Sequence, residues 1–228
     1  MKADIVIVGG AGHIGLPLGI LFANKGKKVI LYDKNKKNII KINKLQMPFM
    51  EEGGLSLLKK NKNRIFATTD KKSLKDAKIV IICIGTPLKK SKPDLIFFFN
   101  MFREVKKYLD PKKLLIIRSS IYPGTCLKIQ KFLGKNFKNI SYCPERVVQG
   151  KSISELHRLP QIISGLSKVS VNQSKNLFKL ICRKIIITSI LEAELIKLFS
   201  NAWRYINFSI SNQFYNICEK FGINFNKQ

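Results

Sequence analysis

The chain has 228 residues, 45% of them hydrophobic, and a formal net charge of +28, so it can bury a sizeable core in one or two domains. Such a charge is typical of proteins that bind nucleic acid or anionic membranes, but here the excess is scattered lysine without an arginine-rich arm, zinc-finger spacing or aromatic RNA-binding motif. No apolar run approaches the roughly 20 residues that span a bilayer, so we predict a cytoplasmic protein with neither nucleic acid nor membrane as partner.

The chain begins with an apolar strand at residues 4–8 that leads into Gly10-Ala11-Gly12-His13-Ile14-Gly15 and an apolar helix at residues 16–24. A Gly-x-Gly-x-x-Gly turn between a strand and a helix predicts a dinucleotide site. In that interpretation the first glycine allows a tight turn, the second lets backbone approach a pyrophosphate, and the third lets helix and strand pack closely. The helix N-terminus adds N–H groups and partial positive charge. The cofactor-binding candidates here are Gly10, Gly12, His13, Ile14 and Gly15.

A second apolar strand at residues 28–32 ends in Asp33, near the spacing expected for the residue that binds ribose. A carboxylate there would accept hydrogen bonds from the ribose hydroxyls and repel a 2′-phosphate, which favours NAD over NADP. Lysines follow Asp33, so NADP stays open. The alternative is an ordinary strand-to-helix turn with a solvated acid.

Strand-like and helical patterns then alternate as far as residue 187. After a helix at 36–44 and a loop at 47–54, we expect strands at 65–68, 79–84, 114–118, 140–143, 161–164 and 184–187, with a helix at 97–109. Continuous apolar runs such as 79–84 are typical of central strands covered on both faces. The alternation predicts a doubly wound, mostly parallel Rossmann-type α/β sheet over residues 1–187.

The pattern changes after residue 188, where residues 191–221 contain neither proline nor glycine and have apolar residues at three- and four-residue spacing. This predicts one long helix, with Glu192 and Glu194 in its first turn, where acids suit the helix dipole. We predict that residues 188–228 open a second, central domain. Lys197 and Asn201 lie four residues apart on one helix face and are catalytic candidates; a solvated lysine beside a polar residue is the alternative.

Three loops follow the ends of predicted central strands, where open α/β sheets bind ligands. They are Gly85-Thr86-Pro87, the segment 119–125, and Pro144-Glu145-Arg146, and they supply Gly85, Thr86, Ser120 and Glu145 as candidates. Any one loop could be ordinary turn chemistry, with Thr125 as a helix N-cap. The presence of all three loops at one edge of the sheet favours a ligand-binding site.

The five cysteines follow no metal-ligand spacing, so we expect no metal site. Cys83 falls in a predicted strand and Cys143 at the end of another, while Cys182 and Cys218 fall in helical patterns. Buried, reduced thiols fit this usage best.

Five ordered segments resemble the UDP-glucose/GDP-mannose dehydrogenase family, most closely its branch that oxidises N-acetylated UDP-sugars. They are Gly10-Ala-Gly-His-Ile-Gly-Leu-Pro-Leu18, Ile84-Gly-Thr-Pro87, Ser119-Ser-Ile-Tyr-Pro-Gly-Thr125, Cys143-Pro-Glu-Arg-Val147 and Glu192-Ala-Glu-Leu-Ile-Lys-Leu-Phe-Ser-Asn-Ala-Trp-Arg-Tyr205. The resemblance covers essentially the whole chain. It is specific for the family and weaker for the exact sugar.

The resemblance implies oxidation of a UDP-sugar C6 alcohol to the carboxylate, with two NAD used in succession and a cysteine as nucleophile. Carried over by motif, Lys197 would stabilise oxyanion charge and Asn201 would help hold the substrate. Glu145 would position or activate water with help from the hydroxyl of Ser120, where the family commonly has threonine. A homodimer through the long helix is also implied.

The family's nucleophilic cysteine and its UDP-sugar-binding C-terminal domain would both lie beyond residue 228. We therefore expect a truncated chain, with a separately encoded C-terminal half as one explanation. Two alternatives stay open. One is a two-electron dehydrogenase of the 6-phosphogluconate or hydroxyisobutyrate type, and the other is an NAD-binding remnant without catalysis.

Overall fold

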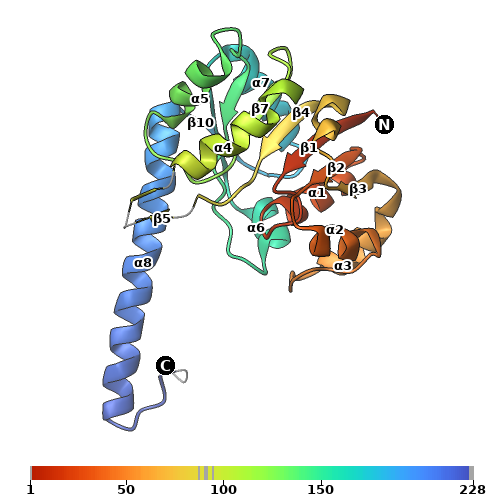
Figure 1. Cartoon of the computed structure of the whole chain (residues 1–228). Helices are drawn as coiled ribbons and strands as arrows, with labels where there is room; N and C mark the ends of the chain where they lie inside the picture. Colours follow the sequence, from red (N-terminus) through yellow and green to blue (C-terminus); the bar gives the residue numbers. More distant parts are fainter. Residues whose placement is uncertain (1, 87, 90–91, 94, 226–228) are drawn as a thin grey trace.

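The computed structural model of this chain describes residues 2–86, 88–89, 92–93 and 95–225; Pro87, part of one predicted site loop, lies outside them. An eight-stranded sheet with the order β10-β9-β8-β7-β4-β1-β2-β3 forms its centre (Figure 1). Neighbouring strands are parallel except at β8–β9. The strands are β1 (Ala3–Val8), β2 (Val29–Tyr32), β3 (Ile65–Thr68), β4 (Ala77–Ile82), β7 (Leu114–Ile117), β8 (Ile140–Tyr142), β9 (Gln161–Gly165) and β10 (Ile185–Ile187).

Helices cover both faces of the sheet, and a short antiparallel pair lies apart from it, formed by β5 (Leu88–Lys89) and β6 (Lys92–Pro93). The α-helices are α1 (Gly15–Asn24), α2 (Lys36–Asn43), α3 (Gly54–Lys60), α4 (Leu95–Val105), α5 (Thr125–Leu133), α6 (Ser152–Arg158), α7 (Lys168–Phe178) and α8 (Ile190–Lys220). Three 3₁₀ turns complete the described elements: η1 (Lys62–Arg64), η2 (Lys71–Asp76) and η3 (Lys106–Tyr108).

The core consists of two apolar layers, one on each face of the sheet. Successive side chains of a strand point to opposite faces, so Ile5 and Ile7 of β1 pack with α1, α6 and α7, while Val6 and Val8 pack with α4 and α5. All four side chains are at most 2% exposed. The buried strands therefore read as continuous apolar runs, and the predicted doubly wound, mostly parallel sheet is confirmed.

Several local expectations were wrong or incomplete. The loop expected at 47–54 ends in a helix, α3, that the glycines at 53 and 54 concealed. The strand β9 runs antiparallel to β8, which an apolar run of this length cannot indicate. Cys83 follows β4 rather than lying in it, and Cys182 follows α7 in an irregular segment rather than in a helix. Thr125 is the first residue of α5, whose N-cap is Gly124.

The tight turn after β1 is made by Gly9, one residue before the glycine to which it was assigned. Gly9 has φ +79°, a left-handed conformation that favours glycine. At Gly10 a Cβ would lie 2.7 Å from the Cα of Leu31, and at Gly15 it would lie 2.3 Å from the carbonyl oxygen of Gly9. Gly10 and Gly15 thus allow close packing, while a Cβ at Gly12 would meet nothing closer than 3.4 Å.

The long helix α8 begins with a capping box, in which the Ser189 side chain accepts from Glu192 N and the Glu192 side chain accepts from Ser189 N. Its buried residues are Ala193, Glu194 and Lys197, all in its first eight residues. Beyond them the helix projects from the body toward the C-terminus (Figure 1). Within the described residues, no helix is both long enough and apolar enough to cross a membrane.

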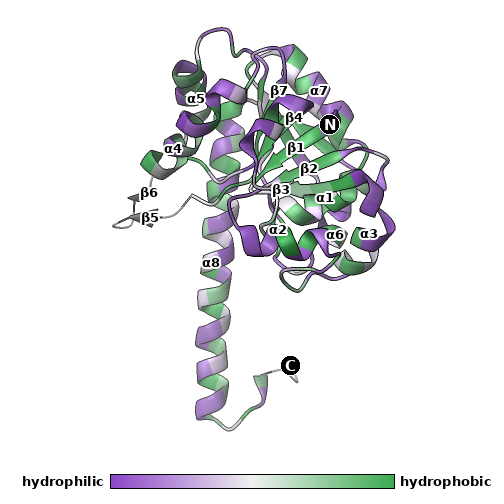
Figure 2. Cartoon of the chain, turned by 45° about the vertical axis from the view of Figure 1, so that its right-hand side comes forward, coloured by the Kyte–Doolittle hydropathy of each residue, from purple (hydrophilic) through white to green (hydrophobic). Residues whose placement is uncertain are grey.

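The projecting part of α8 carries an exposed apolar stripe, and its hydrophobic residues appear as green bands along the helix (Figure 2). Its side chains recur at three- and four-residue spacing, so they share one face of the helix. We call this face the α8 stripe: it consists of Phe199, Trp203, Ile206, Ile210, Phe214, Ile217 and the C-cap residue Phe221, all between 45% and 76% exposed.

Candidate active site

Four loops meet at one edge of the sheet, because β1, β4, β7 and β8 are neighbouring parallel strands and end at the same side. They are the glycine turn after β1 and the three loops that the sequence had singled out. A hydrogen bond joins two of them directly: the Thr86 hydroxyl donates to the carbonyl oxygen of Ser120 at 2.6 Å. The structure therefore brings the predicted loops together, as the topology of such sheets requires.

The first cavity at this edge is a cleft of about 640 Å³ between the glycine turn and the loop after β4. Gly12, Asp33, Gly85 and Thr86 line it, all of them predicted cofactor residues. Its size lies within the range of small-molecule sites, about 300–1,000 Å³. Gly12 is half-buried and lines this cleft, so its backbone is accessible to a closely approaching pyrophosphate.

Asp33 is fixed in this cleft by two backbone donors. Its Oδ2 accepts from Ala11 N at 3.0 Å, inside the glycine turn, and its Oδ1 accepts from Asn35 N at 2.9 Å. A carboxylate has about four lone-pair positions on its two oxygens, so both oxygens keep capacity for further donors such as a pair of ribose hydroxyls.

The other predicted cofactor residues have different surroundings. Gly10 and Gly15 are buried and close to backbone, so they shape the turn and lie back from the cleft. Ile14 lines a second cavity. His13 is exposed, and its ring lies 4.0 Å from that of Phe49, centroid to centroid. The loop that carries Phe49 therefore contacts the glycine turn from outside.

The second cavity, of about 150 Å³, continues from the cleft and holds the predicted catalytic groups. Ser120, Glu145 and Lys197 line it together with Gly85 and Thr86. Glu145 and Lys197 are each 6% exposed. One oxygen of Glu145 accepts from Val147 N, which holds the carboxylate in the turn after β8.

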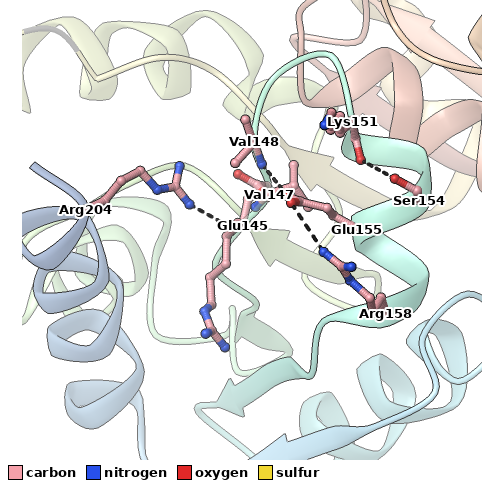
Figure 3. A network of polar contacts seen from close by, with 9 residues as sticks. Glu145, Val147, Val148, Lys151, Ser154, Glu155, Arg158 and Arg204 are labelled. Carbon is pink, nitrogen blue, oxygen red and sulfur yellow. Dashed lines mark hydrogen bonds and ion pairs between the residues drawn. The ribbon is translucent and has the colours of Figure 1, made fainter. Parts of the chain in front are cut away.

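Lys197 also lines a third cavity of about 380 Å³ with Asn201, so α8 forms the wall between the two. Arg204 reaches from α8 to the loop that carries Glu145 and donates to the carbonyl oxygen of Arg146 at 3.0 Å (Figure 3). On the other side of this loop, Val148 N donates to Glu155 at 2.6 Å. The loop is therefore tied to both α8 and α6.

The comparisons with known proteins agree with this geometry. Residues 3–182 match the family model for the UDP-glucose/GDP-mannose dehydrogenase family, NAD binding domain, and residues 191–227 match that family's central domain. The chain belongs to the UDP-glucose/GDP-mannose dehydrogenase family. It carries the NAD binding domain of that family, which confirms NAD as the cofactor.

Relatives of this dehydrogenase family align with nearly the whole chain. The UDP-N-acetyl-D-mannosamine dehydrogenase of Methanococcus vannielii is 35% identical over 98% of the chain and 53% of its own length. The enzyme of the same name from Escherichia coli is 28% identical, over 98% and 57%. The solved UDP-D-ManNAc dehydrogenase of Pyrococcus horikoshii superposes with a TM-score of 0.87 at 31% identity, over 98% and 56%. The chain thus spans about half the length of each.

Sequence reasoning missed a buried cation in this family member's site. Arg118, at the end of β7, is 2% exposed and lines the second cavity. Its Nη1 donates to the carbonyl oxygen of Cys143 at 3.2 Å and to Gln161 Oε1 at 2.9 Å, while Gln161 Nε2 donates to Pro144 O at 3.2 Å. These bonds hold the backbone just before Glu145. A charged residue that ends a wholly apolar run was the available signal.

Burial lowers the pKa of Lys197 below its ordinary value, and nearby arginines, chiefly Arg204, lower it further. Glu145 acts in the opposite direction. The surroundings thus disfavour the ammonium form, as at many catalytic positions. Lys197 is already desolvated and lines the second cavity, so its side chain is placed to interact with a negative charge that develops there.

This depressed pKa predicts how stability depends on pH. Because the folded-state pKa lies below the unfolded value, the protonated side chain is disfavoured in the fold at neutral pH, and stability is gained as pH rises through the folded pKa. We expect Lys197→Met to raise the free energy of unfolding at pH 7, with a gain that shrinks toward pH 10. Urea unfolding at several pH values measures this, and a constant difference would contradict it.

Proposed function

We propose that this chain supplies the cofactor site and part of the catalytic apparatus for oxidising the C6 alcohol of a UDP-sugar, of the N-acetylmannosamine type, to its uronate. The single observation that carries the proposal is the convergence of Ser120, Glu145 and Lys197 on one cavity that opens from the NAD cleft. Family membership favours this reaction over that of a hydroxyacid dehydrogenase. A non-catalytic remnant is the alternative, which an activity measurement separates.

When bound in this cleft, NAD would supply the hydride acceptor. In the proposal Gly12 and the N-terminus of α1 bind its pyrophosphate, Asp33 binds a ribose, and Gly85 and Thr86 border the path to the second cavity. These assignments rest on the lining of the cleft, to which Gly12, Asp33, Gly85 and Thr86 all contribute. Gly10, His13, Ile14 and Gly15 would support the turn.

For the reaction itself, we assign Lys197 to stabilise negative charge on the substrate oxygen, since an ammonium acts strongly in a dry cavity. Glu145 would take a proton from water. The Ser120 hydroxyl would hydrogen-bond that water, and the Asn201 amide would hold the sugar from the third cavity. The surplus of cations, with Arg118, Arg146 and Arg204 all close enough to lower the pKa of Lys197, suits an anionic diphosphate substrate.

The proposed reaction can be tested by complementation. The part of the Pyrococcus horikoshii relative beyond the aligned region would be added as a separate polypeptide, with NAD and UDP-N-acetylmannosamine. We expect two NADH per uronate, with the product identified by mass spectrometry. Lys197→Met should abolish turnover while NAD binding persists. Normal NAD binding without turnover in any combination would favour the remnant.

Asp33 provides a separate test of cofactor choice. Asp33→Ala should weaken NAD binding at least tenfold, since a hydrogen bond to a charged group contributes about 1.5–3 kcal/mol, and it should narrow the preference for NAD over NADP. Asp33→Asn removes the charge but keeps an oxygen that accepts from Ala11 N. A loss of NAD affinity in this variant is therefore not caused by a misfolded glycine turn. Asp110→Ala, at an exposed turn, is the control. Calorimetry that finds equal affinity for NAD and NADP in the unchanged chain would contradict the assignment.

We further propose that residues 1–187 form the dinucleotide-binding unit and 188–228 the start of a central domain that pairs in a homodimer. Support comes from the boundaries of the matched family domains and from the exposed α8 stripe. Exposed contiguous apolar surface tends to be buried by association. A separately encoded C-terminal half is the second candidate to cover it.

The α8 stripe predicts self-association of the isolated chain. Replacing two of its members, Trp203→Lys with Phe214→Lys, should shift the chain toward the monomer, because charges cannot be buried in an apolar contact. Ser209→Lys with Asn212→Lys adds the same charge on another face of α8 and should change little. Light scattering over a concentration series measures the effect. A clean monomer of the unchanged chain at high concentration would contradict the prediction.

A further inference from the structure

A crevice of about 650 Å³ opens at the edge of the sheet opposite the cofactor cleft, where β1, β4 and β7 begin. Its floor is apolar: Ile5, Ile79 and Leu114 come from the three strands, and Leu177 and Leu180 come from α7 and the turn after it. The crevice lies in the size range of small-molecule sites, about 300–1,000 Å³. None of the proposed catalytic or cofactor residues lines it.

The rim of this crevice is cationic. Lys27, Lys78, Lys112 and Lys113 line it, with Asp4 as the one carboxylate among the residues described there. Asp4 accepts from Lys28 N at 2.8 Å, so one of its oxygens is already used. The lysines that are scattered in sequence are therefore gathered here around an apolar floor.

One rim lysine is held in place by backbone. The Nζ of Lys113 donates to the carbonyl oxygen of Lys75 at 2.6 Å and to that of Leu74 at 3.4 Å. An ammonium has three donors, so a third remains for a ligand. On α7, Gln173 Oε1 accepts from Asn139 Nδ2 at 2.8 Å, which turns the amide so that its N–H donors remain available.

We propose that this crevice binds a small amphipathic anion, an apolar ring or chain that carries a phosphate or carboxylate group. The apolar floor would bury the body of the ligand, and the rim lysines would pair with its charge. An inorganic anion would not bury the apolar floor, and a neutral apolar ligand would not form ion pairs with the rim lysines. Asp4 and Gly9 are five residues apart on an extended strand, about 17 Å at 3.3 Å per residue, so the site is independent of NAD.

The test uses 1-naphthyl phosphate as probe and calorimetry with the chain saturated with NAD, so that the cofactor cleft is filled. We expect one probe molecule per chain, bound at least tenfold more tightly than inorganic phosphate or 1-naphthol. Lys78→Glu with Lys112→Glu should weaken binding at least tenfold, because both side chains are exposed rim cations whose reversal repels the phosphate.

The matched control is Lys59→Glu with Lys60→Glu on α3, which changes the net charge equally at two exposed lysines outside the crevice. This control should keep affinity within twofold, and melting curves check that both variants fold. Absence of probe binding, unchanged binding in the rim variant, or an equal loss in the control would each overturn the proposal. The last result would show that only the general positive field of the protein attracts the probe.

Discussion

The 228-residue chain alone is expected not to complete the oxidation of UDP-N-acetylmannosamine or UDP-N-acetylglucosamine to the uronate. The second oxidation needs a thiolate within reach of C6, because the covalent adduct gives the aldehyde carbon its tetrahedral, hydride-donating form. We propose that none of the five cysteines present can supply it. The assay is NADH absorbance, with the product checked by mass spectrometry.

The surroundings of the thiols support this expectation. Burial raises the pKa of Cys83 and Cys143 to about 12 and that of Cys182 to about 11, and it also raises the pKa of Cys126. A thiol with such a pKa is protonated at neutral pH and a poor nucleophile. Cys218 lies on α8, 21 residues beyond Lys197, which is about 30 Å at 1.5 Å per residue.

Cys83 is the one thiol that lines the second cavity, so it defines the outcome that would contradict the expectation. The contrary result would be that the chain alone forms two NADH per uronate at an ordinary rate. If Cys83→Ser abolished that activity, Cys83 would be identified as the nucleophile. Cys182→Ser, at a buried cysteine away from the cavity, is the matched control. Turnover that appears only with an added C-terminal half would instead identify a split enzyme.

Elements dominated by burial were predictable from the sequence. The strands β2 and β7 are apolar runs that are buried at every position, and a run of four residues is too short for a helix. The strand direction of β9 was not predictable, because it depends on where the chain re-enters the sheet. The helix α3 was hidden because Gly53 and Gly54 indicate a turn, although Gly53 serves as its N-cap.

The position of a candidate residue at a cavity was predictable where an acid follows a strand end, as for Glu145 and Asp33; the roles of these residues stay predictions. It was not predictable where a side chain acts across the fold. Arg118 bonds to Gln161, 43 residues later in the chain, and nothing near either residue indicates the pairing. From the sequence, Glu194 was expected to interact with the dipole of its own helix, α8. In the structure its carboxylate instead accepts hydrogen bonds at the N-terminus of α5.

Glu194 is fully buried between α8 and the start of α5. Its Oε2 accepts from Gly124 N at 2.6 Å and its Oε1 accepts from Cys126 N at 2.9 Å. These are N–H groups at a helix N-terminus, which have no partner within their own helix. The carboxylate therefore supplies the cap that Gly124 lacks, and it joins α8 to the loop that carries Ser120.

Glu194→Ala is therefore expected to lower the free energy of unfolding by about 3 kcal/mol, since it leaves one buried and one half-buried donor without an acceptor and each unsatisfied group costs about 1–3 kcal/mol. Urea unfolding, with the slope unchanged and the midpoint lowered, would report it. Glu219→Ala removes an exposed acid near the far end of the same helix and should leave the midpoint almost unchanged. Because the carboxylate also fixes α8 against the loop after β7, the Glu194 variant should bind NAD with little change once folded but lose activity in the complemented enzyme. A midpoint equal to that of the control would show that Glu194 does not hold the two helices together.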